Sequence, residues 1–338
     1  MNWGLNSMKS YLITGSTGFL GRQIIEAIIR ENNCDSTRFI LPVRNINKAR
    51  NLYTVISENT KIGLEFVECS MENMTVERFP SNMTLDYIIH CATPTSSKYM
   101  ISHPAETADA IVLGTRNALE LAKFFHVKSM VCLSSMEVYG QVDDEGKPRA
   151  ENELGTLSLN VARSCYPMGK RMAEHYCHIY QQEYGVPVKI ARLSQVFGKG
   201  VAASDNRVFM QFARSAMEGK DIVLKTRGQS LGNYCATEDA ISGILTILKN
   251  GNDGAVYNVV NEDNTMKIID MAQIVASEIA DGNINVVLDL EDSSKTGYAP
   301  DTGLRMSGEK LRGLGWKPTK NIVEMYQDVV KEIKFSSR

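Results

Sequence analysis

The chain has 338 residues, 43% of them hydrophobic, which is enough to bury the core of one large α/β domain with an appendage or of two domains, and which excludes a disordered chain. Its 37 Lys and Arg residues nearly balance 39 Asp and Glu residues, so the formal charge is −2 and no basic stripe points to a nucleic-acid partner. No apolar run approaches the roughly 18 residues that span a membrane, and we expect a cytoplasmic protein without membrane contact.

Cysteine and histidine usage argues against a metal site and against a disulfide framework. The cysteines include no C-x-x-C pair and several lie in apolar runs, so we expect reduced thiols. His175 and His178 have helical spacing but no obvious carboxylate or thiolate partner, which predicts helix-surface residues. The cysteines are Cys34, Cys69, Cys91, Cys132, Cys165, Cys177 and Cys235.

The first predicted strand runs through 11–14 and ends in a turn that contains Gly15, Gly18 and Gly21, and an amphipathic helix follows. Glycines at such a turn let the backbone approach a pyrophosphate, whose charge the N–H groups and dipole of the helix then meet. The spacing is G-x-x-G-x-x-G and not the commoner G-x-G-x-x-G, so a glycine-rich turn without a ligand is the alternative. The place of the turn in an opening βα unit favours a dinucleotide site.

The second predicted strand, 38–44, ends about where a dinucleotide fold meets the adenosine ribose. An acidic side chain there suits the ribose hydroxyls of NAD, whereas Arg44, with help from Lys48, suits a 2′-phosphate. The alternative is a solvated surface arginine. The sequence therefore favours NADP slightly over NAD.

Strands and helices continue to alternate through the first two thirds of the chain, which predicts an α/β fold with a Rossmann-type, doubly wound parallel sheet. The further predicted strands are 64–69, 86–92, 129–134, 187–192 and 255–260. The predicted helices are 106–125, 161–184 and 236–248, with a polar helical segment between 69 and 86 and a loop over 141–158.

After residue 192 the pattern changes to loops and short helices broken by glycines, which predicts a smaller α/β substrate-binding lobe. Its tail contains a predicted helix at 267–280, a strand at 285–288 and a helix at 321–334. We expect a dinucleotide-binding domain over 8–192 plus 236–260, and a substrate-binding lobe over 193–235 plus 261–338.

Two hydroxyl-bearing segments carry the expected chemistry. Ser134 and Ser135 end a predicted strand, and Tyr166-x-x-x-Lys170 places a phenol and an ammonium one helical turn apart. Nearby positive charge stabilises a phenolate, so Tyr166 could move a proton while Ser135 holds the substrate oxygen and a nicotinamide exchanges hydride. A lone Tyr-x-x-x-Lys is usually an ordinary helix face, but here it accompanies the glycine turn.

Taken in order, these motifs resemble the extended short-chain dehydrogenase/reductases, specifically the NAD-dependent epimerase/dehydratase group that acts on nucleotide sugars. The resemblance implies that Ser135, Tyr166 and Lys170 are catalytic, and that helices like 106–125 and 161–184 form a four-helix bundle in a homodimer. It rests on 14–21, 90–93, 134–140, 166–170, 192–198 and 314–318. The implied cofactor-binding residues are Gly15, Thr17, Gly18, Phe19, Leu20, Gly21, Arg44, Ser70, Cys91, Ala92, Thr93, Ser134, Tyr166 and Lys170.

The chain departs from the family pattern at four positions. Ser70 replaces an aspartate, Ile111 and Gln195 each replace an asparagine, and Gly232 replaces the arginine that grips the substrate diphosphate. Other arginines would then have to reach those phosphates. The expected substrate-binding residues are Thr95, Ser135, Met136, Gln195, Arg207, Arg227 and Arg305.

The triplet Ser135-Met136-Glu137 bears on the reaction type. Hexose 4,6-dehydratases often carry Thr-Asp-Glu there, whereas a decarboxylase of nucleotide-linked glucuronate keeps the glutamate, and the segment from Tyr166 to Arg171 with Glu174 is similar to its helix. Glu137 is therefore a fourth candidate catalytic residue or a polar loop residue.

Three functions stay open. We expect net keto-reduction with NADP(H) at a carbinol or ketone carbon of a nucleotide-activated sugar or polyol, in which case the enzyme should tolerate Glu137→Gln. The first alternative is a redox-neutral epimerase, dehydratase or glucuronate decarboxylase with held NAD. The second is a non-catalytic dinucleotide-binding sensor or scaffold, although such proteins tend to lose the tyrosine or the lysine.

Overall fold

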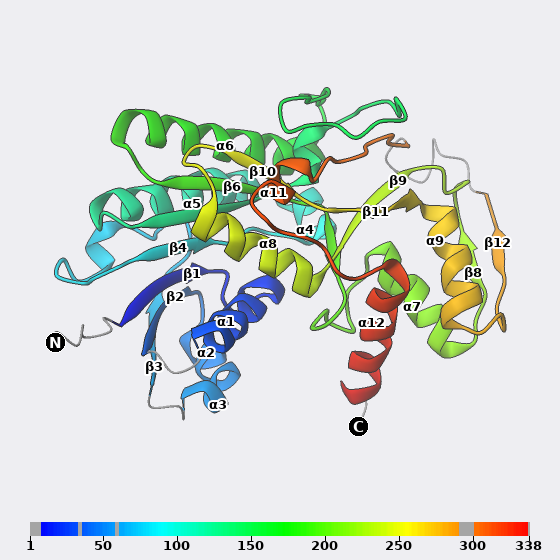
Figure 1. Cartoon of the computed structure of the whole chain (residues 1–338), viewed down its shortest axis with the longest axis horizontal. Coiled ribbons are helices and arrows are strands. Elements are labelled where there is room, and N and C mark those ends of the chain that lie inside the picture. Colours follow the sequence, from blue (N-terminus) through cyan, green and yellow to red (C-terminus); the bar gives the residue numbers. More distant parts are fainter. Residues whose placement is uncertain (1–7, 33–35, 58–60, 291–300, 337–338) are drawn as a thin grey trace. The chain divides into compact units, whose positions relative to one another are not determined.

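The computed structural model describes residues 8–32, 36–57, 61–290 and 301–336 (Figure 1). The chain divides into two compact units. The first comprises Met1–Val138, Leu157–Arg192 and Ile244–Tyr257, and the second comprises Tyr139–Thr156, Leu193–Gly243 and Asn258–Arg338. These ranges differ from the expected domain boundaries over 139–156, 236–243 and 258–260, and the expected boundaries stay a prediction.

The first unit contains a seven-stranded sheet with the strand order β3-β2-β1-β4-β5-β6-β10. From β3 to β5 every neighbouring pair is parallel, which is the order that right-handed crossovers on both faces produce. The predicted Rossmann-type α/β fold is confirmed. The strands are β1 (Lys9–Thr14), β2 (Thr37–Val43), β3 (Ile62–Glu68), β4 (Tyr87–His90), β5 (Ser129–Ser135), β6 (Val188–Leu193) and β10 (Val256–Val259).

Helices cover both faces of this sheet. Figure 1 shows α5 (Pro104–Phe124) beside α6 (Cys165–Tyr184), with α1 (Phe19–Asn32) on the opposite face. Helix α1 packs Ile24, Ile25 and Ile28 against the sheet, as its amphipathic pattern predicts. The other helical elements of this unit are α2 (Ile46–Leu52), α3 (Thr54–Ser57), η1 (Val76–Arg78), α4 (Ser97–Ser102), η2 (Met136–Tyr139, its last residue in the second unit) and η3 (Ala162–Ser164), and α8 (Thr237–Asn250) and β10 each have residues in both units.

The prediction of a polar helix between β3 and β4 is wrong. That crossover contains only the 3-10 turn Val76–Arg78, because Pro80 interrupts it and its buried residues Met74, Phe79 and Met83 do not follow a helical repeat. Helices α2 and α3 instead lie before β3, where the side chain of Asn45 accepts a hydrogen bond from the Lys48 amide and so caps α2.

The second unit is richer in strands than the sequence predicts. Strands β7, β8 and β9 lie within the segment that was expected to hold only loops and short helices, and β11 lies where no element was expected. The polar run of β11 hides its antiparallel pairing with β9. The elements are β7 (Gln195–Phe197), α7 (Val208–Glu218), β8 (Ile222–Leu224), β9 (Leu231–Ala236), β11 (Asn261–Lys267), α9 (Ile268–Ile274), η4 (Val275–Ile279), β12 (Val286–Leu288), α11 (Glu309–Arg312) and α12 (Ile322–Ser336).

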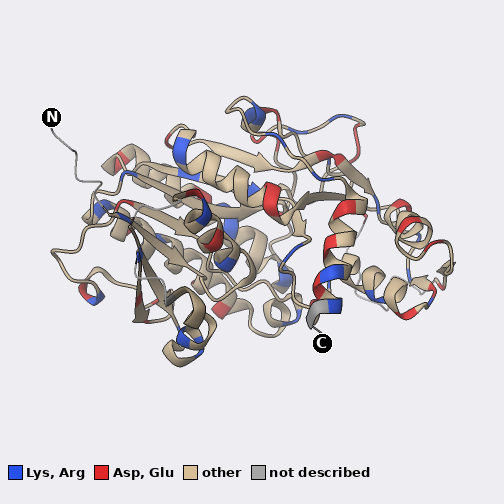
Figure 2. Ribbon diagram, turned by 60° about the horizontal axis from the view of Figure 1, so that its bottom comes forward, with Lys and Arg blue, Asp and Glu red and all other residues tan. Residues whose placement is uncertain are grey.

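Basic and acidic residues are interspersed over the ribbon in Figure 2. Among the helices that the structure describes, none combines the length and the apolar composition that a membrane crossing requires.

Candidate active site

The glycine turn joins the carboxyl end of β1 to α1 in a tightly packed form. Gly15 has φ of +67°, and its carbonyl accepts a hydrogen bond of 2.9 Å from the Gly18 amide. A Cβ atom at Gly21 would lie 2.3 Å from the Gly15 carbonyl oxygen, so the first turn of α1 can approach the loop only without a side chain there. Each of the two glycines is thus required by local geometry.

A buried threonine locks this turn to the end of β4. The register pairs Thr14 with His90, and the Thr14 hydroxyl oxygen accepts hydrogen bonds of 3.0 Å from the amides of both Cys91 and Ala92. Its only proton therefore goes to His90 Nδ1, 2.9 Å away, which leaves the proton of the neutral ring on Nε2, facing Thr115. Burial and, secondarily, the nearby Lys170 lower the pKa of His90 to about 3, so the ring is neutral.

The resemblance names Cys91 and Ala92 as cofactor-binding residues and uses His90 as part of a motif, but sequence reasoning missed this function of Thr14. The backbone of Ala92 lies 3.0 Å from where a Cβ of Gly15 would stand, so the two loops that Thr14 joins are in direct contact. The threonine at the end of the first strand is the sequence signal that could have indicated this contact between β1 and the end of β4.

The turn and the end of β4 have the chemistry that a dinucleotide needs. Helix α1 has no acidic residue in its first turn, so the positive end of its dipole faces no competing carboxylate there. Within the described part of the chain, the buried hydroxyls of Ser16 and Thr93 have no hydrogen-bond partner. Buried polar groups are normally satisfied, so these two are available to a polar ligand.

The other predicted cofactor residues lie around these loops. Thr17, Phe19 and Leu20 are half-buried at the start of α1, Arg44 is exposed after β2, and Ser70 accepts a hydrogen bond of 3.2 Å from the Asn73 side chain.

Ser135, Tyr166 and Lys170 lie on two adjacent elements of the first unit. Ser135 ends β5, which continues through 133–135 beyond the paired residues His90 and Cys132. Lys170 is buried, and its ammonium donates a hydrogen bond of 2.7 Å to the Leu133 carbonyl. Burial lowers its pKa from the ordinary lysine value. Its Nζ lies 6.0 Å from the centre of the Tyr166 ring.

The departure at Ile111 has a packing explanation. Ile111 of α5 is buried in one cluster with Tyr166 and Met100, and its Cδ1 would lie 3.3 Å from a Cβ at Gly169. An apolar wall thus stands behind the Tyr166 ring where the family usually has an amide.

Glu137 is held beside Ser135. Its amide donates to the Ser135 hydroxyl oxygen over 3.2 Å, and its carboxylate accepts a hydrogen bond of 2.9 Å from Arg163. The Arg163 guanidinium lies 5.7 Å from the Tyr166 ring centre. Sequence reasoning missed Arg163, which no motif marked.

The Ser134 side chain is hydrogen-bonded to α6. Its hydroxyl donates to Glu174 of α6 over 2.5 Å, and Glu174 is also paired with Arg192 at the end of β6. The Ser134 side chain is therefore committed to the protein, which leaves its backbone for the predicted cofactor contact.

The predicted substrate-binding residues are divided between the units. Thr95 is exposed and Met136 half-buried in the first unit. In the second unit Gln195 is half-buried at the start of β7. A Cβ at Gly232 would lie 2.1 Å from the Tyr234 hydroxyl, so β9 has no room there for the arginine that the family carries.

The three predicted arginines, all in the second unit, differ in their partners. Arg207 pairs with Asp205, and Arg305 holds Asp144 through two hydrogen bonds of 2.8 and 2.9 Å. The Arg305 guanidinium and the Gly146 amide lower the pKa of Asp144 to about 2. Arg227 is exposed, and no ion pair involves it within the described residues.

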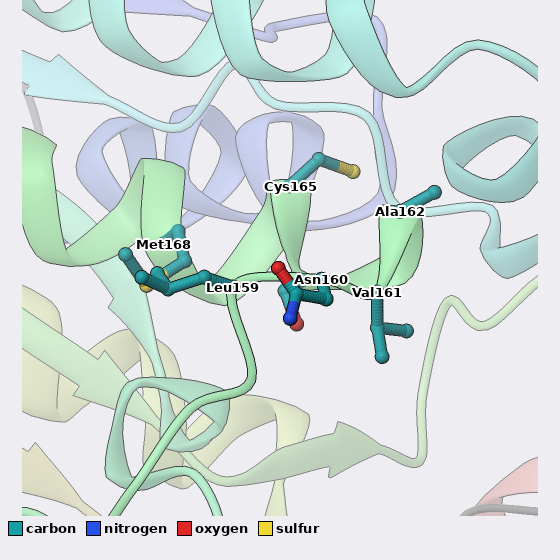
Figure 3. A pocket seen from close by; sticks show the side chains of 7 residues that line it. Leu159, Asn160, Val161, Ala162, Cys165 and Met168 are labelled. Carbon is teal, nitrogen blue, oxygen red and sulfur yellow. The ribbon is translucent and has the colours of Figure 1, made fainter.

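A pocket of about 370 Å³ lies at the segment that leads into α6 (Figure 3). Its lining is mainly apolar and includes none of the predicted catalytic residues Ser135, Tyr166 and Lys170. The lining residues are Leu159, Asn160, Val161, Ala162, Ser164, Cys165 and Met168.

Within the described part of the chain, no group of three or more His, Cys, Asp or Glu side chains could hold a metal ion. Six of the cysteines are free thiols, and Cys34 lies outside the described residues.

Comparison with known proteins gives the same fold and one family. Residues 11–261 match the model of the NAD dependent epimerase/dehydratase family. UDP-glucuronic acid decarboxylase 1 of Danio rerio is 27% identical over 332 residues, 98% of this chain and 73% of that protein. UDP-glucuronic acid decarboxylase 3 of Arabidopsis thaliana is 26% identical over 93% of this chain and 85% of its own length.

Solved structures share the fold at lower identity. UDP-glucose 4-epimerase of Thermotoga maritima, solved with UDP-glucose, has a TM-score of 0.79 at 20% identity and covers 97% of this chain and 100% of its own. dTDP-glucose 4,6-dehydratase of Bacillus anthracis, solved with NAD, has a TM-score of 0.76 at 22% identity over 97% of both chains. RMD of Pseudomonas aeruginosa, solved with NADPH, has a TM-score of 0.73 at 21% identity over 97% and 100%.

Proposed function

Because the chain belongs to the NAD dependent epimerase/dehydratase family, we propose that it modifies a nucleotide-activated sugar by redox-neutral chemistry with a retained nicotinamide dinucleotide. The observation that carries the proposal is Lys170 of α6, which donates to the Leu133 carbonyl near the Ser135 end of β5 and lies 6.0 Å from the centre of the Tyr166 ring. Non-catalytic dinucleotide-binding proteins of this kind tend to lose the tyrosine or the lysine, and this chain keeps both.

Redox-neutral conversion replaces net keto-reduction as the favoured function. The two curated relatives described above span nearly the whole chain and are named decarboxylases, and the structures of the same fold include an epimerase and a dehydratase. In each of these conversions the products, taken together, have the same oxidation level as the substrate. The bound cofactor therefore returns to its starting form in each cycle and need not be replaced.

The residues of the first unit have complementary tasks. When bound, a nicotinamide dinucleotide accepts hydride from a carbinol carbon and can return it. Tyr166 takes the proton of the reacting hydroxyl and later gives it back, and Ser135 holds the same oxygen by a hydrogen bond. The ammonium of Lys170 favours the phenolate form of Tyr166 through its charge.

Decarboxylation of a nucleotide-linked hexuronate is the specific reaction that the site favours. Oxidation of the carbon β to the carboxylate gives a β-keto acid. Such an acid loses CO₂ readily, since the electron pair left behind is delocalised into the new ketone. Glu137 beside Ser135 supplies a carboxylate for the proton transfers of this second step, and Arg163 holds that carboxylate in place.

A substrate panel tests the proposal. We would incubate the purified protein, in parallel without added cofactor and with added NADPH, with UDP-, dTDP-, GDP- and CDP-linked hexoses and hexuronates, and follow the products by mass spectrometry. The expected result is conversion without net consumption of NAD(P)H, with loss of 44 Da from a hexuronate if the reaction is decarboxylation, since CO₂ of about that mass leaves. Turnover that consumes one NADPH per product would restore the reductase, and tight cofactor binding without any turnover would restore the sensor or scaffold.

A further inference from the structure

Strand β5 is attached to buried ionic groups at its carboxyl end. The Ser134 hydroxyl donates a hydrogen bond of 2.5 Å to Glu174, and Arg192 grips the same carboxylate through Nε and Nη2 at 2.9 and 2.7 Å. All three residues are buried, with exposed fractions of 3–6%. The cluster joins β5, α6 and β6, so three elements meet at one carboxylate.

The same helix holds the neighbouring residue of the strand. Tyr166, Lys170 and Glu174 follow one another at intervals of four residues and therefore lie along one stripe of α6. Lys170 donates to the Leu133 carbonyl, and Glu174 accepts from the next residue, Ser134. Ser135 is the next residue of the strand. The hydrogen bonds of α6 to Leu133 and Ser134 therefore fix the position of Ser135 relative to α6.

Stability alone does not call for such a cluster. Taking a carboxylate and a guanidinium out of water is costly, and replacing a buried ion pair by well-packed apolar side chains often leaves a protein equally or more stable. What an ion pair adds is directional, two-point geometry, since a bidentate guanidinium fixes both oxygens of a carboxylate. The cluster contacts the residue before Ser135, so its best explanation is that it fixes the position of this end of β5.

We propose that Glu174 and Arg192 are positioning residues that set Ser135 at its working distance from Tyr166. This inference rests on the proposed function for the task of Ser135. The ionic cluster does not touch the substrate. It acts through the Ser134 hydroxyl, while Lys170 serves both as an anchor of β5 and as the charge beside the phenol.

The other end of β5 offers a matched control. Ser129, the first residue of the strand, accepts a hydrogen bond of 2.8 Å from the buried ammonium of Lys189, which pairs with Asp253 at 2.6 Å. Both ends of one strand thus have a serine attached to an ion pair. Only the carboxyl end bears the reacting groups.

The test compares two double variants, Glu174→Met/Arg192→Met and Lys189→Met/Asp253→Asn, for melting temperature, kcat, KM and amide hydrogen exchange along 129–137. For the first we expect an unchanged or higher Tm, a kcat about 10- to 100-fold lower with KM within about 3-fold, and faster exchange confined to 133–137. The second should change exchange only near Ser129 and leave kcat unaltered.

Equal losses of kcat in both variants, or an unchanged kcat with unchanged exchange in the first, would overturn the inference. If the first variant does not fold, Ser134→Ala removes the attachment and leaves the ion pair in place, and it should reproduce the fall in kcat and the local exchange. If the wild type converts no sugar, the proposed function fails, and the exchange along 133–137 still decides whether the cluster positions the strand.

Discussion

Lys170 shows how burial alters a single residue in this protein. Its ammonium is buried, makes no ion pair within the described residues, and donates one hydrogen bond to the Leu133 carbonyl. Burial lowers its pKa, because the charged form loses hydration. A charge so poorly screened acts strongly on the nearby phenol of Tyr166.

Replacing Tyr166 by Phe should remove turnover and leave cofactor binding largely intact. The phenol proton is needed at the reacting oxygen, whereas the ring itself packs against Met100 and Ile111. The rate should fall about 10²–10⁴-fold. Lys170→Met should lower the rate and also weaken cofactor binding, which fluorescence titration of NAD(H) measures. Equal loss of cofactor affinity in both variants would contradict the separate tasks.

Glu137→Gln distinguishes the possible second steps. With decarboxylation as the favoured reaction, the variant should still oxidise its substrate but accumulate the ketone, because an amide cannot deliver the proton that the carbon needs once CO₂ has left. Rapid-quench mass spectrometry measures the ketone. Normal turnover would mean that the enzyme is a simple epimerase or reductase, which should tolerate this change.

Arg44→Ala tests the cofactor preference. Arg44 is exposed after β2 and makes no ion pair within the described chain. If its guanidinium binds a 2′-phosphate, the variant should lose about 10- to 100-fold in affinity for NADP(H) and little for NAD(H). Arg50→Ala, an exposed arginine of α2, is the control. An unaltered NADP(H)-to-NAD(H) ratio of dissociation constants would refute the preference.

At the scale of elements, the β1–turn–α1 unit is held by two close approaches. The carbonyl of Gly15 lies against Gly21, and the backbone of Ala92 lies against Gly15. The Thr14 hydroxyl ties the second approach by accepting the amides of Cys91 and Ala92. The glycine turn is thus positioned by β4 as well as by its own strand.

Gly21→Ala should disrupt this unit. The new methyl group would meet the Gly15 carbonyl at 2.3 Å, and the backbone shift should cost about 1–3 kcal/mol of stability or binding. Calorimetric titration with NAD(P)H and thermal melting measure the two effects. Gly63→Ala in β3 is the control, since its nearest neighbour atom would be 3.7 Å away. Unchanged values for Gly21→Ala would show that the turn relaxes freely.

At the scale of the whole molecule, the expected homodimer concerns the outer faces of α5 and α6. These helices lie side by side and expose Leu113, Phe124, Met172 and Tyr184. Paired helices with exposed apolar side chains are suited to a four-helix bundle with a second copy.

Leu113→Glu/Met172→Glu should convert the predicted dimer into a monomer, because charged side chains would be buried between the helices. Size-exclusion chromatography with light scattering measures the mass. Val55→Glu on α3, an exposed apolar residue away from this face, should leave the dimer unchanged. A wild-type protein that is monomeric throughout would refute the bundle.

The sequence alone determined the Rossmann-type fold, the glycine turn and the candidate residues Ser135, Tyr166 and Lys170. These features are local: apolar strands at regular intervals, glycines at fixed spacing and a four-residue repeat on one helix. Local patterns failed where distant packing decides. The crossover between β3 and β4 buries Met74, Phe79 and Met83 without a repeat, and the polar strand β11 forms only because β9 pairs with it.

Only the tertiary structure decided which polar residues support the site. Arg163 reaches Glu137 across 26 positions, and Thr14 reaches His90 across 76. Ser134 finds Glu174 across 40 positions, and Arg192 finds the same carboxylate from another strand. No spacing rule encodes these contacts. The parallel sheet brings the carboxyl ends of β1, β4, β5 and β6 to one edge, and buried polar groups there must satisfy one another because water is excluded.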